Sequence, residues 1–329
     1  MTKLPLLRFR PLLKRYVWGG RRLAELGKDL GEGTDYAESW EVADHGQDQS
    51  VVAEGPLAGM TLGQLVADHG LALLGRHHPQ TNFPLLFKFL DAQRALSVQV
   101  HPNDEQASHQ TPPDLGKTEA WVIVDCEPGA KLYAGLKRGF DKAALEREIK
   151  RGTCELCLHE IPVQPGDCVF LPAGTVHAIG EGILIAEIQQ SSDTTFRLYD
   201  WNRVGTDGQP RQLHVTEALG VIDFERGPVS PQTPRPVARE GWEQLVACDK
   251  FVLERGQLHG KSVRGGDDRM HILAVLSGQA TVSPTEAAEL PSAEAQTLTT
   301  GSTLLVPACT GEIAILPTAS CTMLDIFLP

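Results

Sequence analysis

Polar side chains at every second position mark the segment LSVQVHPND as a strand that could do chemistry. In a β-strand, Ser97, Gln99 and His101 point to one side, and the leucine and valines between them point to the other. A half-exposed strand has the same alternation, with its polar face in water. On the inner side of a barrel, however, a glutamine and a histidine need something to bind.

A second segment, GKTEAWVIVD, adds a carboxylate on the same two-residue period. Lys117, Glu119 and Trp121 share one face, although a lysine and a glutamate at a strand start are also compatible with solvation. His101, Glu119 and His177 together supply two imidazoles and one carboxylate. This set binds a divalent transition metal and leaves coordination positions open, and Gln99 could add a neutral oxygen.

His177 belongs to GDCVFLPAGTVHAI, in which a glycine, five residues, Pro-Ala-Gly and two further residues precede the histidine. This spacing resembles the second signature motif of the cupins. The glycines and the proline predict tight turns around a buried strand, and the next strand would aim His177 into a barrel. Because of the surrounding motif, we interpret His177 as a metal ligand rather than as a packed core histidine.

The elements that position these residues are mostly short strands, punctuated by glycine and proline. Thr61 and Asp141 are placed to cap two helices. The segment GSTLLVPACTGEIAI repeats the glycine, five residues, proline pattern. The sequence therefore predicts a mostly β protein with two cupin-like β-barrel or jelly-roll domains and a small helical insertion.

The proposed domain boundaries follow a stretch with four prolines. Residues 1–226 would form the metal-binding domain with helical insertions, 227–239 a proline-rich connection, and 240–329 a degenerate second cupin domain. Glu312 replaces the histidine in the repeated motif, and Cys309 replaces its glycine. We expect His271 to pack or to face solvent, so each chain should bind one metal ion.

Composition limits the classes of partner. The 30 Lys and Arg residues against 42 Asp and Glu residues give a net charge of −12, which argues against nucleic acid. No apolar run predicts membrane insertion, and the N-terminus does not resemble a signal peptide. Seven cysteines without a spacing framework are typical of reduced cytoplasmic thiols. We therefore expect a cytoplasmic protein, and no particular oligomeric state is predicted.

Several motifs in order, over about residues 16 to 203, resemble the type I mannose-6-phosphate isomerases, which are zinc-dependent cupins. The matching stretches are YVWGG, AESWE, FPLLFKFLDAQRALSVQVHPND, GKTEAW, PAGTVHAI and EIQQSSDTTFRLYDWNR. The resemblance implies interconversion of mannose 6-phosphate and fructose 6-phosphate through an enediolate. It also implies one Zn²⁺ per chain, with Gln99, His101, Glu119 and His177 as ligands.

The resemblance assigns further residues to the active site. It places Arg197 and Lys117 in the active site, where we expect them to stabilise developing negative charge, and we expect Asp193 or Glu187 to assist proton movement. The residues that it places at the substrate are Ser97 and Lys88, near the phosphate, and Trp18 of YVWGG.

Two other functions stay open at this stage, and one residue departs from the pattern. Two histidines and a carboxylate are also the triad of non-haem iron oxygenases, and a cupin could bind a sugar phosphate without catalysis. The oxygenase would not need Lys88, Ser97 or Arg197. Ile179 stands where some members, especially eukaryotic ones, carry an aromatic residue, so substrate contacts there should differ.

Overall fold

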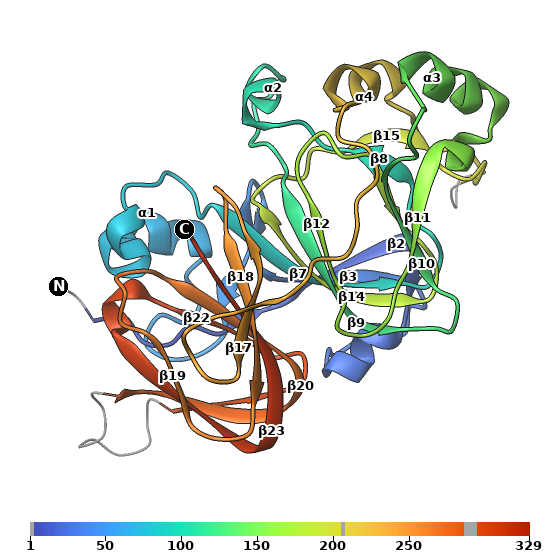
Figure 1. Cartoon of the computed structure of the whole chain (residues 1–329). Helices are drawn as coiled ribbons and strands as arrows, with labels where there is room; N and C mark the ends of the chain where they lie inside the picture. The colour runs from blue at the N-terminus through green and yellow to red at the C-terminus, as the bar shows by residue number, and fades with distance from the viewer. Residues whose placement is uncertain (1–2, 205–207, 286–294) are drawn as a thin grey trace.

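Short strands between glycine- and proline-rich turns build most of the protein, which confirms the predicted mostly β class. A computed structural model describes residues 3–204, 208–285 and 295–329. It shows two β lobes side by side, one formed by the N-terminal and central segments and one by the C-terminal segment (Figure 1).

The first lobe packs a five-stranded sheet against a six-stranded sheet. In spatial order, the five strands are β11 (Leu158–Pro162), β10 (Lys131–Leu136), β13 (His177–Ile179), β8 (Val98–Val100) and β15 (Phe196–Tyr199). The six strands are β12 (Cys168–Leu171), β9 (Glu119–Cys126), β14 (Ile183–Gln190), β7 (Leu85–Ala92), β3 (Tyr36–Val42) and β2 (Leu12–Gly20). Two small pairs join β1 (Phe9–Arg10) to β6 (Val51–Val52) and β4 (Asp44–His45) to β5 (Asp48–Gln49).

The central strands β7 and β14 of the six-stranded sheet are buried on both faces, and strand alternation decides which residues line the barrel. Along β14, Leu184, Ala186 and Ile188 pack into one apolar core, whereas Ile183 and Ile185 pack into another, shared with the five-stranded sheet. The second core fills part of the barrel interior. The next inward-facing positions of β14, β9 and β7 carry polar side chains.

The second lobe is an eight-stranded antiparallel sheet with its own inner core. Its strands are β16 (Arg235–Pro236), β17 (Trp242–Ala247), β18 (Val252–Leu258), β19 (Ser262–Gly265), β20 (His271–Pro284), β21 (Gln296–Thr299), β22 (Thr303–Val306) and β23 (Glu312–Phe327).

Helices lie outside the sheets (Figure 1). They are α1 (Leu62–Leu74), α2 (Asp104–Ser108), α3 (Lys142–Arg151) and α4 (Val215–Val221), with short 3-10 turns at Arg22–Leu26, Gly75–His77, Cys154–Cys157 and Ala308–Thr310. The two predicted caps are confirmed: Thr61 forms a capping box with Gln64, and Asp141 accepts a hydrogen bond from the backbone of Ala144. Among the described residues, no helix combines the length and the apolar character needed to cross a membrane.

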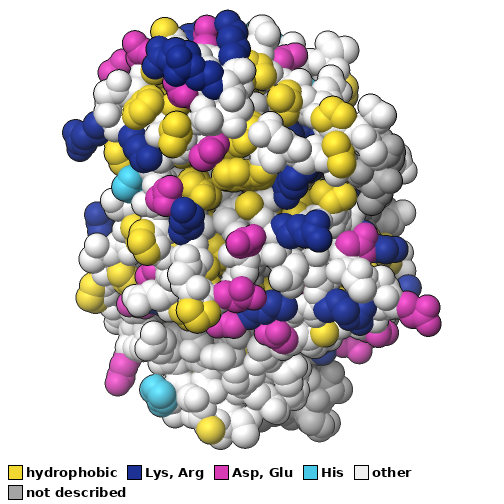
Figure 2. All heavy atoms as spheres, turned by 90° about the vertical axis from the view of Figure 1, so that its right-hand side faces the viewer, with side chains coloured by type: hydrophobic (Ala, Val, Ile, Leu, Met, Phe, Trp, Pro, Cys, Tyr) yellow, Lys and Arg dark blue, Asp and Glu magenta, His cyan; other side chains and the backbone are white. Residues whose placement is uncertain are grey.

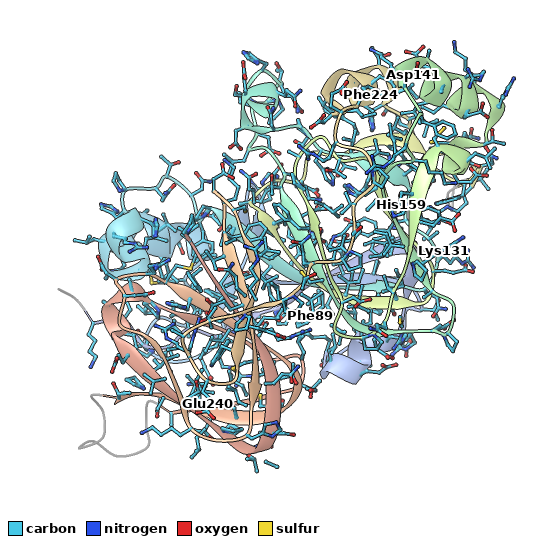
Figure 3. The ribbon with its side chains drawn as sticks, viewed as in Figure 1. Phe89, Lys131, Asp141, His159, Phe224 and Glu240 are labelled. Carbon is cyan, nitrogen blue, oxygen red and sulfur yellow. The ribbon has the colours of Figure 1, made fainter. Side chains whose placement is uncertain are left out.

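One apolar core joins the two lobes. Phe89, on the outer face of the six-stranded sheet, lies at the junction (Figure 3) and belongs to the same cluster as Phe251 of the second lobe. The rings of Phe170 and Phe251 are 6.3 Å apart in an edge contact, and Leu7 forms a β-bridge with Leu305. The second lobe therefore covers the back of the sheet whose front faces the barrel interior. The division at 227–239 stays a prediction.

Replacing Phe251 with alanine should lower the free energy of unfolding by about 3–5 kcal/mol, because a fully buried ring is removed from the shared core. Urea unfolding followed by fluorescence measures this loss. Phe251→Leu is the matched control and should lose much less, because most of the apolar volume remains. A loss below about 1 kcal/mol in the alanine variant would show that this core does not hold the lobes together.

Candidate metal centre and active-site pocket

Three neighbouring strands present charged side chains to the barrel interior in one row. Glu187 of β14 pairs in register with Lys88 of β7 on one side and with Trp121 of β9 on the other. Glu119 begins β9 and pairs with Gln189. Since facing residues of paired strands share a face of the sheet, Lys88, Glu119 and Glu187 all point inward.

The opposite sheet brings the two histidines to the same place. His177 of β13 pairs with Gln99 of β8, and His101 follows two residues later. His101, Glu119 and His177 each offer a ligand atom within 4.8 Å of the other two. His177 Nε2 lies 3.2 Å from one Glu119 carboxylate oxygen, and His101 Nε2 lies 3.6 Å from the other. All three residues are about 1% exposed.

Backbone contacts orient both imidazoles toward this centre. His101 Nδ1 lies 2.8 Å from the Thr194 carbonyl, and His177 Nδ1 lies 2.9 Å from the Thr175 carbonyl. A carbonyl only accepts, so each Nδ1 carries the proton and each Nε2 keeps its lone pair. Burial lowers the pKa of His177 to about 4 and that of His101 well below its ordinary value. Neutral imidazoles are the form that binds a metal ion.

The donor atoms in the centre fit a cation. Both carboxylate oxygens of Glu119 and Nε2 of His101 are buried without a hydrogen-bond partner. Unpartnered buried acceptors are costly unless something else satisfies them, and a divalent ion does so. The carboxamide nitrogen of Gln99 lies 3.4 Å from His177 Nε2, so a turn of this amide would bring its oxygen to the centre.

The floor beside the centre holds a compensated set of charges. Lys88 Nζ lies 3.2 Å from Glu38 and 3.2 Å from Glu187, and Lys117 Nζ lies 3.3 Å from Glu119. Burial alone would lower the pKa of Lys88, but Glu187 and Glu38 raise it. Burial likewise opposes ionisation of Glu187, yet Lys88 and Lys117 lower the pKa of that carboxyl, so it is ionised.

A pocket of about 300 Å³ opens over this floor. Trp18 lines it and stacks on Tyr16, with ring centroids 5.5 Å apart. Arg197 also lines the pocket, and its Nε donates to Ser97 Oγ at 3.2 Å. Asp193 is exposed and lines the same pocket. Within the described chain, Arg197 forms no ion pair, so its charge is directed to the pocket rather than to a carboxylate.

All eleven site residues singled out in the sequence therefore lie in the metal cluster or along this pocket. Sequence reasoning missed Glu38, Tyr16 and Arg211, which also line it. Glu38 lies in AESWE and Tyr16 in YVWGG, so both residues belong to motifs that the sequence analysis recognised. The two-residue strand period within a motif does not, however, identify a partner on another strand. Figure 2 shows basic and acidic side chains interspersed over one face of the molecule, without an extended basic field there.

Comparison with known proteins gives a consistent result. A model of the family described as phosphomannose isomerase type I, catalytic domain, matches residues 6–120. The chain is 39% identical to the mannose-6-phosphate isomerase ManA of Bacillus subtilis (strain 168) over 85% of this chain and 87% of that protein. It is 37% identical to the mannose-6-phosphate isomerase of Streptococcus mutans, over 82% of this chain and 84% of that protein.

Solved structures agree with the fold. A mannose 6-phosphate isomerase structure from Bacillus subtilis superposes with a TM-score of 0.88 at 28% identity, covering 98% of this chain and 99% of that one. Phosphomannose isomerase from Salmonella typhimurium superposes at 0.77 with 16% identity, covering 99% of this chain and 100% of that one, and supports the fold alone.

Glu119→Ala should weaken metal binding by at least about 100-fold, because it removes the only carboxylate among the three clustered ligands. Metal content after dialysis against a weak chelator, measured by mass spectrometry, checks this. Glu160→Gln is the control, since it removes the charge of an exposed glutamate paired with Lys131 at the edge of the same lobe. Full metal retention by Glu119→Ala would contradict the assignment of this centre.

Proposed function

The chain belongs to the type I phosphomannose isomerase family and is an isomerase of mannose 6-phosphate, and we propose that it interconverts this sugar phosphate with fructose 6-phosphate in the pocket over Lys88, Glu119 and Glu187. The observation that carries the proposal is the buried cluster of His101, Glu119 and His177 beside a pocket lined by cationic side chains. The reaction moves one proton between C1 and C2 and another between their oxygens.

We propose Zn²⁺ as the metal, one ion per chain, held by Gln99, His101, Glu119 and His177. Two neutral imidazoles, a carboxylate and an amide oxygen suit zinc, and such a set leaves room for substrate oxygens. When bound, the ion supplies a Lewis acid that polarises the oxygens at C1 and C2. The protein's own contribution is to keep both Nε2 lone pairs aimed at one point through the Thr194 and Thr175 carbonyls.

Arg197 and Lys117 are placed to stabilise negative charge as it develops on the substrate. Arg197 has a hydroxyl and the Gln212 carbonyl as its hydrogen-bond acceptors, so its charge is available to an oxyanion. Lys117 is buried beside Glu119. Fixed donors in a water-poor pocket act on such charge without having to reorganise.

Ser97, Lys88 and Trp18 are the residues proposed to bind substrate, and their surroundings suggest a different contact for each. Ser97 offers a hydroxyl in the pocket, which suits a phosphate oxygen. The charge of Lys88 is already compensated by Glu38 and Glu187, so we propose that Lys88 donates a hydrogen bond to the sugar rather than acting as a free cation. Trp18 would form an apolar wall of the pocket.

Glu187 and Asp193 are the carboxylates proposed to assist proton movement. Glu187 is buried, ionised and held by Trp121 Nε1 at 3.2 Å, so it is better placed to act on the reacting atoms. Asp193 lies exposed and would exchange protons with solvent. A positioned acid or base contributes about a hundred- to ten-thousandfold to the rate, so replacing either residue separates the two roles.

We extend the proposal to the chain as a whole. Residues 1–226 would be the catalytic cupin domain, 227–239 the connection, and 240–329 a second cupin domain without a catalytic metal. Free thiols at all seven cysteines support the cytoplasm as the compartment.

A coupled assay that detects fructose 6-phosphate formed from mannose 6-phosphate tests the proposed function. We expect turnover that disappears on chelation and returns with Zn²⁺. Dependence on oxygen would favour an iron oxygenase, and binding of the sugar phosphate without turnover would favour a non-catalytic cupin. Either result would overturn the proposal.

Arg197→Lys should lower kcat by about 100-fold and change KM little, because a point charge cannot replace the planar fork that acts in the transition state. Steady-state kinetics with mannose 6-phosphate measure both constants. Arg138→Lys, an exposed arginine elsewhere on the lobe, is the control and should be unchanged. An effect confined to KM would assign Arg197 to phosphate binding instead.

A further inference from the structure

The second lobe contains a buried group of charges that the proposed isomerase chemistry does not use. Arg264 and Asp325 are fully buried, and Arg264 Nε donates to Asp325 at 2.5 Å. Arg264 Nη2 donates to Glu254 at 2.6 Å. His271 is also buried, and its Nδ1 lies 2.8 Å from Asp325. The sequence-based expectation that His271 packs or faces solvent is met by packing, against the Phe327 ring with centroids 4.9 Å apart and between charged partners that the sequence did not reveal.

Strand register shows where this group lies relative to the catalytic centre. In the first lobe, the residue before the proline of the glycine, five residues, proline segment is Leu171, and it pairs with Glu119. In the second lobe, the residue before the corresponding proline is Val306, and it pairs with His271. His271 therefore occupies the position of the metal-binding glutamate.

Two residues further along the same strands, the correspondence continues. In the first lobe, Trp121 of β9 pairs with Glu187 of β14. In the second lobe, Leu273 of β20 pairs with Asp325 of β23. On its other side, Glu187 pairs with Lys88, and Asp325 pairs with Glu254. The row of inward charges of the first lobe thus has a counterpart of three charged residues in the second.

The histidine-bearing strand gives one more match. In the first lobe, Gln99 pairs with His177, and His101 follows Gln99 by two residues. In the second lobe, Gly265 pairs with Glu312, and Asp267 follows Gly265 by two residues. Asp267 Oδ1 is 3.1 Å from His271 Nε2, so these two residues meet as His101 and Glu119 do. Glu312, the counterpart of His177, is exposed, and the counterpart of Gln99 is Gly265, which has no side chain to offer a ligand atom.

We propose that the second lobe keeps a cation site at the position equivalent to the catalytic metal centre, and that the guanidinium of Arg264 is its built-in occupant. Without Arg264, the carboxylates of Glu254, Asp325 and Asp267, together with His271, would bind a divalent cation. The inference rests on the proposed function only in taking the His101, Glu119 and His177 cluster as the metal centre for comparison.

The buried carboxylates distinguish the two centres, although Nη1 of Arg264 itself has no hydrogen-bond partner. In the first lobe, both Glu119 oxygens and His101 Nε2 have no hydrogen-bond partner. In the second lobe, Asp325 accepts from Arg264 and His271, and Glu254 accepts from Arg264. The planar guanidinium of Arg264 donates hydrogen bonds to two carboxylates, and so compensates their charge as a bound metal ion would.

The charges in this centre balance without an ion. Three carboxylates, on Glu254, Asp267 and Asp325, face Arg264, His271 and the neighbouring Arg269, which lies 3.2 Å from Asp267. Burial alone would lower the pKa of His271, but Asp325 and Asp267 raise it to about 9, so the imidazole is charged at neutral pH. Arg264 also stacks over the ring of Trp242 at 4.2 Å, which fixes its plane.

Metal stoichiometry in two variants tests the proposal on a background free of the catalytic ion. Glu119→Ala should bind no ion tightly, and Glu119→Ala with Arg264→Ala should bind one Zn²⁺, as measured by calorimetry with ZnCl₂ alone. The midpoint of thermal unfolding of the double variant should then rise with Zn²⁺, whereas that of Glu119→Ala should not. A folded double variant that binds no Zn²⁺ would overturn the proposal.

A second set of variants applies if the double variant does not fold. Arg264→Met should lower the midpoint of thermal unfolding by about 10 °C or more, because two buried carboxylates lose their cation. Adding Glu254→Gln and Asp325→Asn should recover most of this loss, and Arg264→Lys should lose less than Arg264→Met. Equal stability of Arg264→Met and the unchanged protein would overturn the proposal. Isomerase turnover of Arg264→Lys, measured in parallel, reports on the proposed function separately.

Discussion

Burying the Glu119 carboxylate inside a barrel is the constraint on which the rest of the structure depends. The strand that carries it is covered on both faces, and Glu119 is almost fully buried. A carboxylate without a partner there would take up a proton, or it would destabilise the fold around it. The structure meets this cost with Lys117, two imidazoles whose lone pairs point at the same place, and room for a divalent ion. Activity and stability therefore depend on the same few contacts.

The two lobes meet the same electrostatic problem in different ways. In the first, ligands with unpartnered atoms are placed to bind an exchangeable ion. In the second, Arg264 satisfies the carboxylates permanently and leaves no open position. An arginine carried by the chain is always charged, is never lost by dilution and cannot polarise a substrate as a metal does. Replacing an ion by a guanidinium thus keeps the fold and removes the chemistry.

Much of the first lobe's site could be predicted because its signals are local. The two-residue period places Gln99 with His101 and Lys117 with Glu119. The glycines and the proline before His177 predict the tight turns that position this histidine. Glu38 and Arg264 could not be found in this way, because their partners are distant in sequence. Glu38 pairs with Lys88, 50 residues away, and Arg264 pairs with Asp325, 61 residues away. Strand register determines such pairs, and no single segment reports register between strands distant in sequence. The expectation for His271 missed its charged partners for the same reason.

The shared core gives the second lobe a structural role in the first. The outward residues of the central strands, such as Phe87 and Phe89, are fully buried only because the second lobe and α1 pack on them. Exposing that face would return several large apolar side chains to water, at roughly 1.5–3 kcal/mol each. It would also loosen the strands whose opposite face carries Lys88 and Glu187. The packing of the second lobe therefore supports the strands that carry the active site, while the interior of that lobe needs only charges that balance, which Arg264 provides.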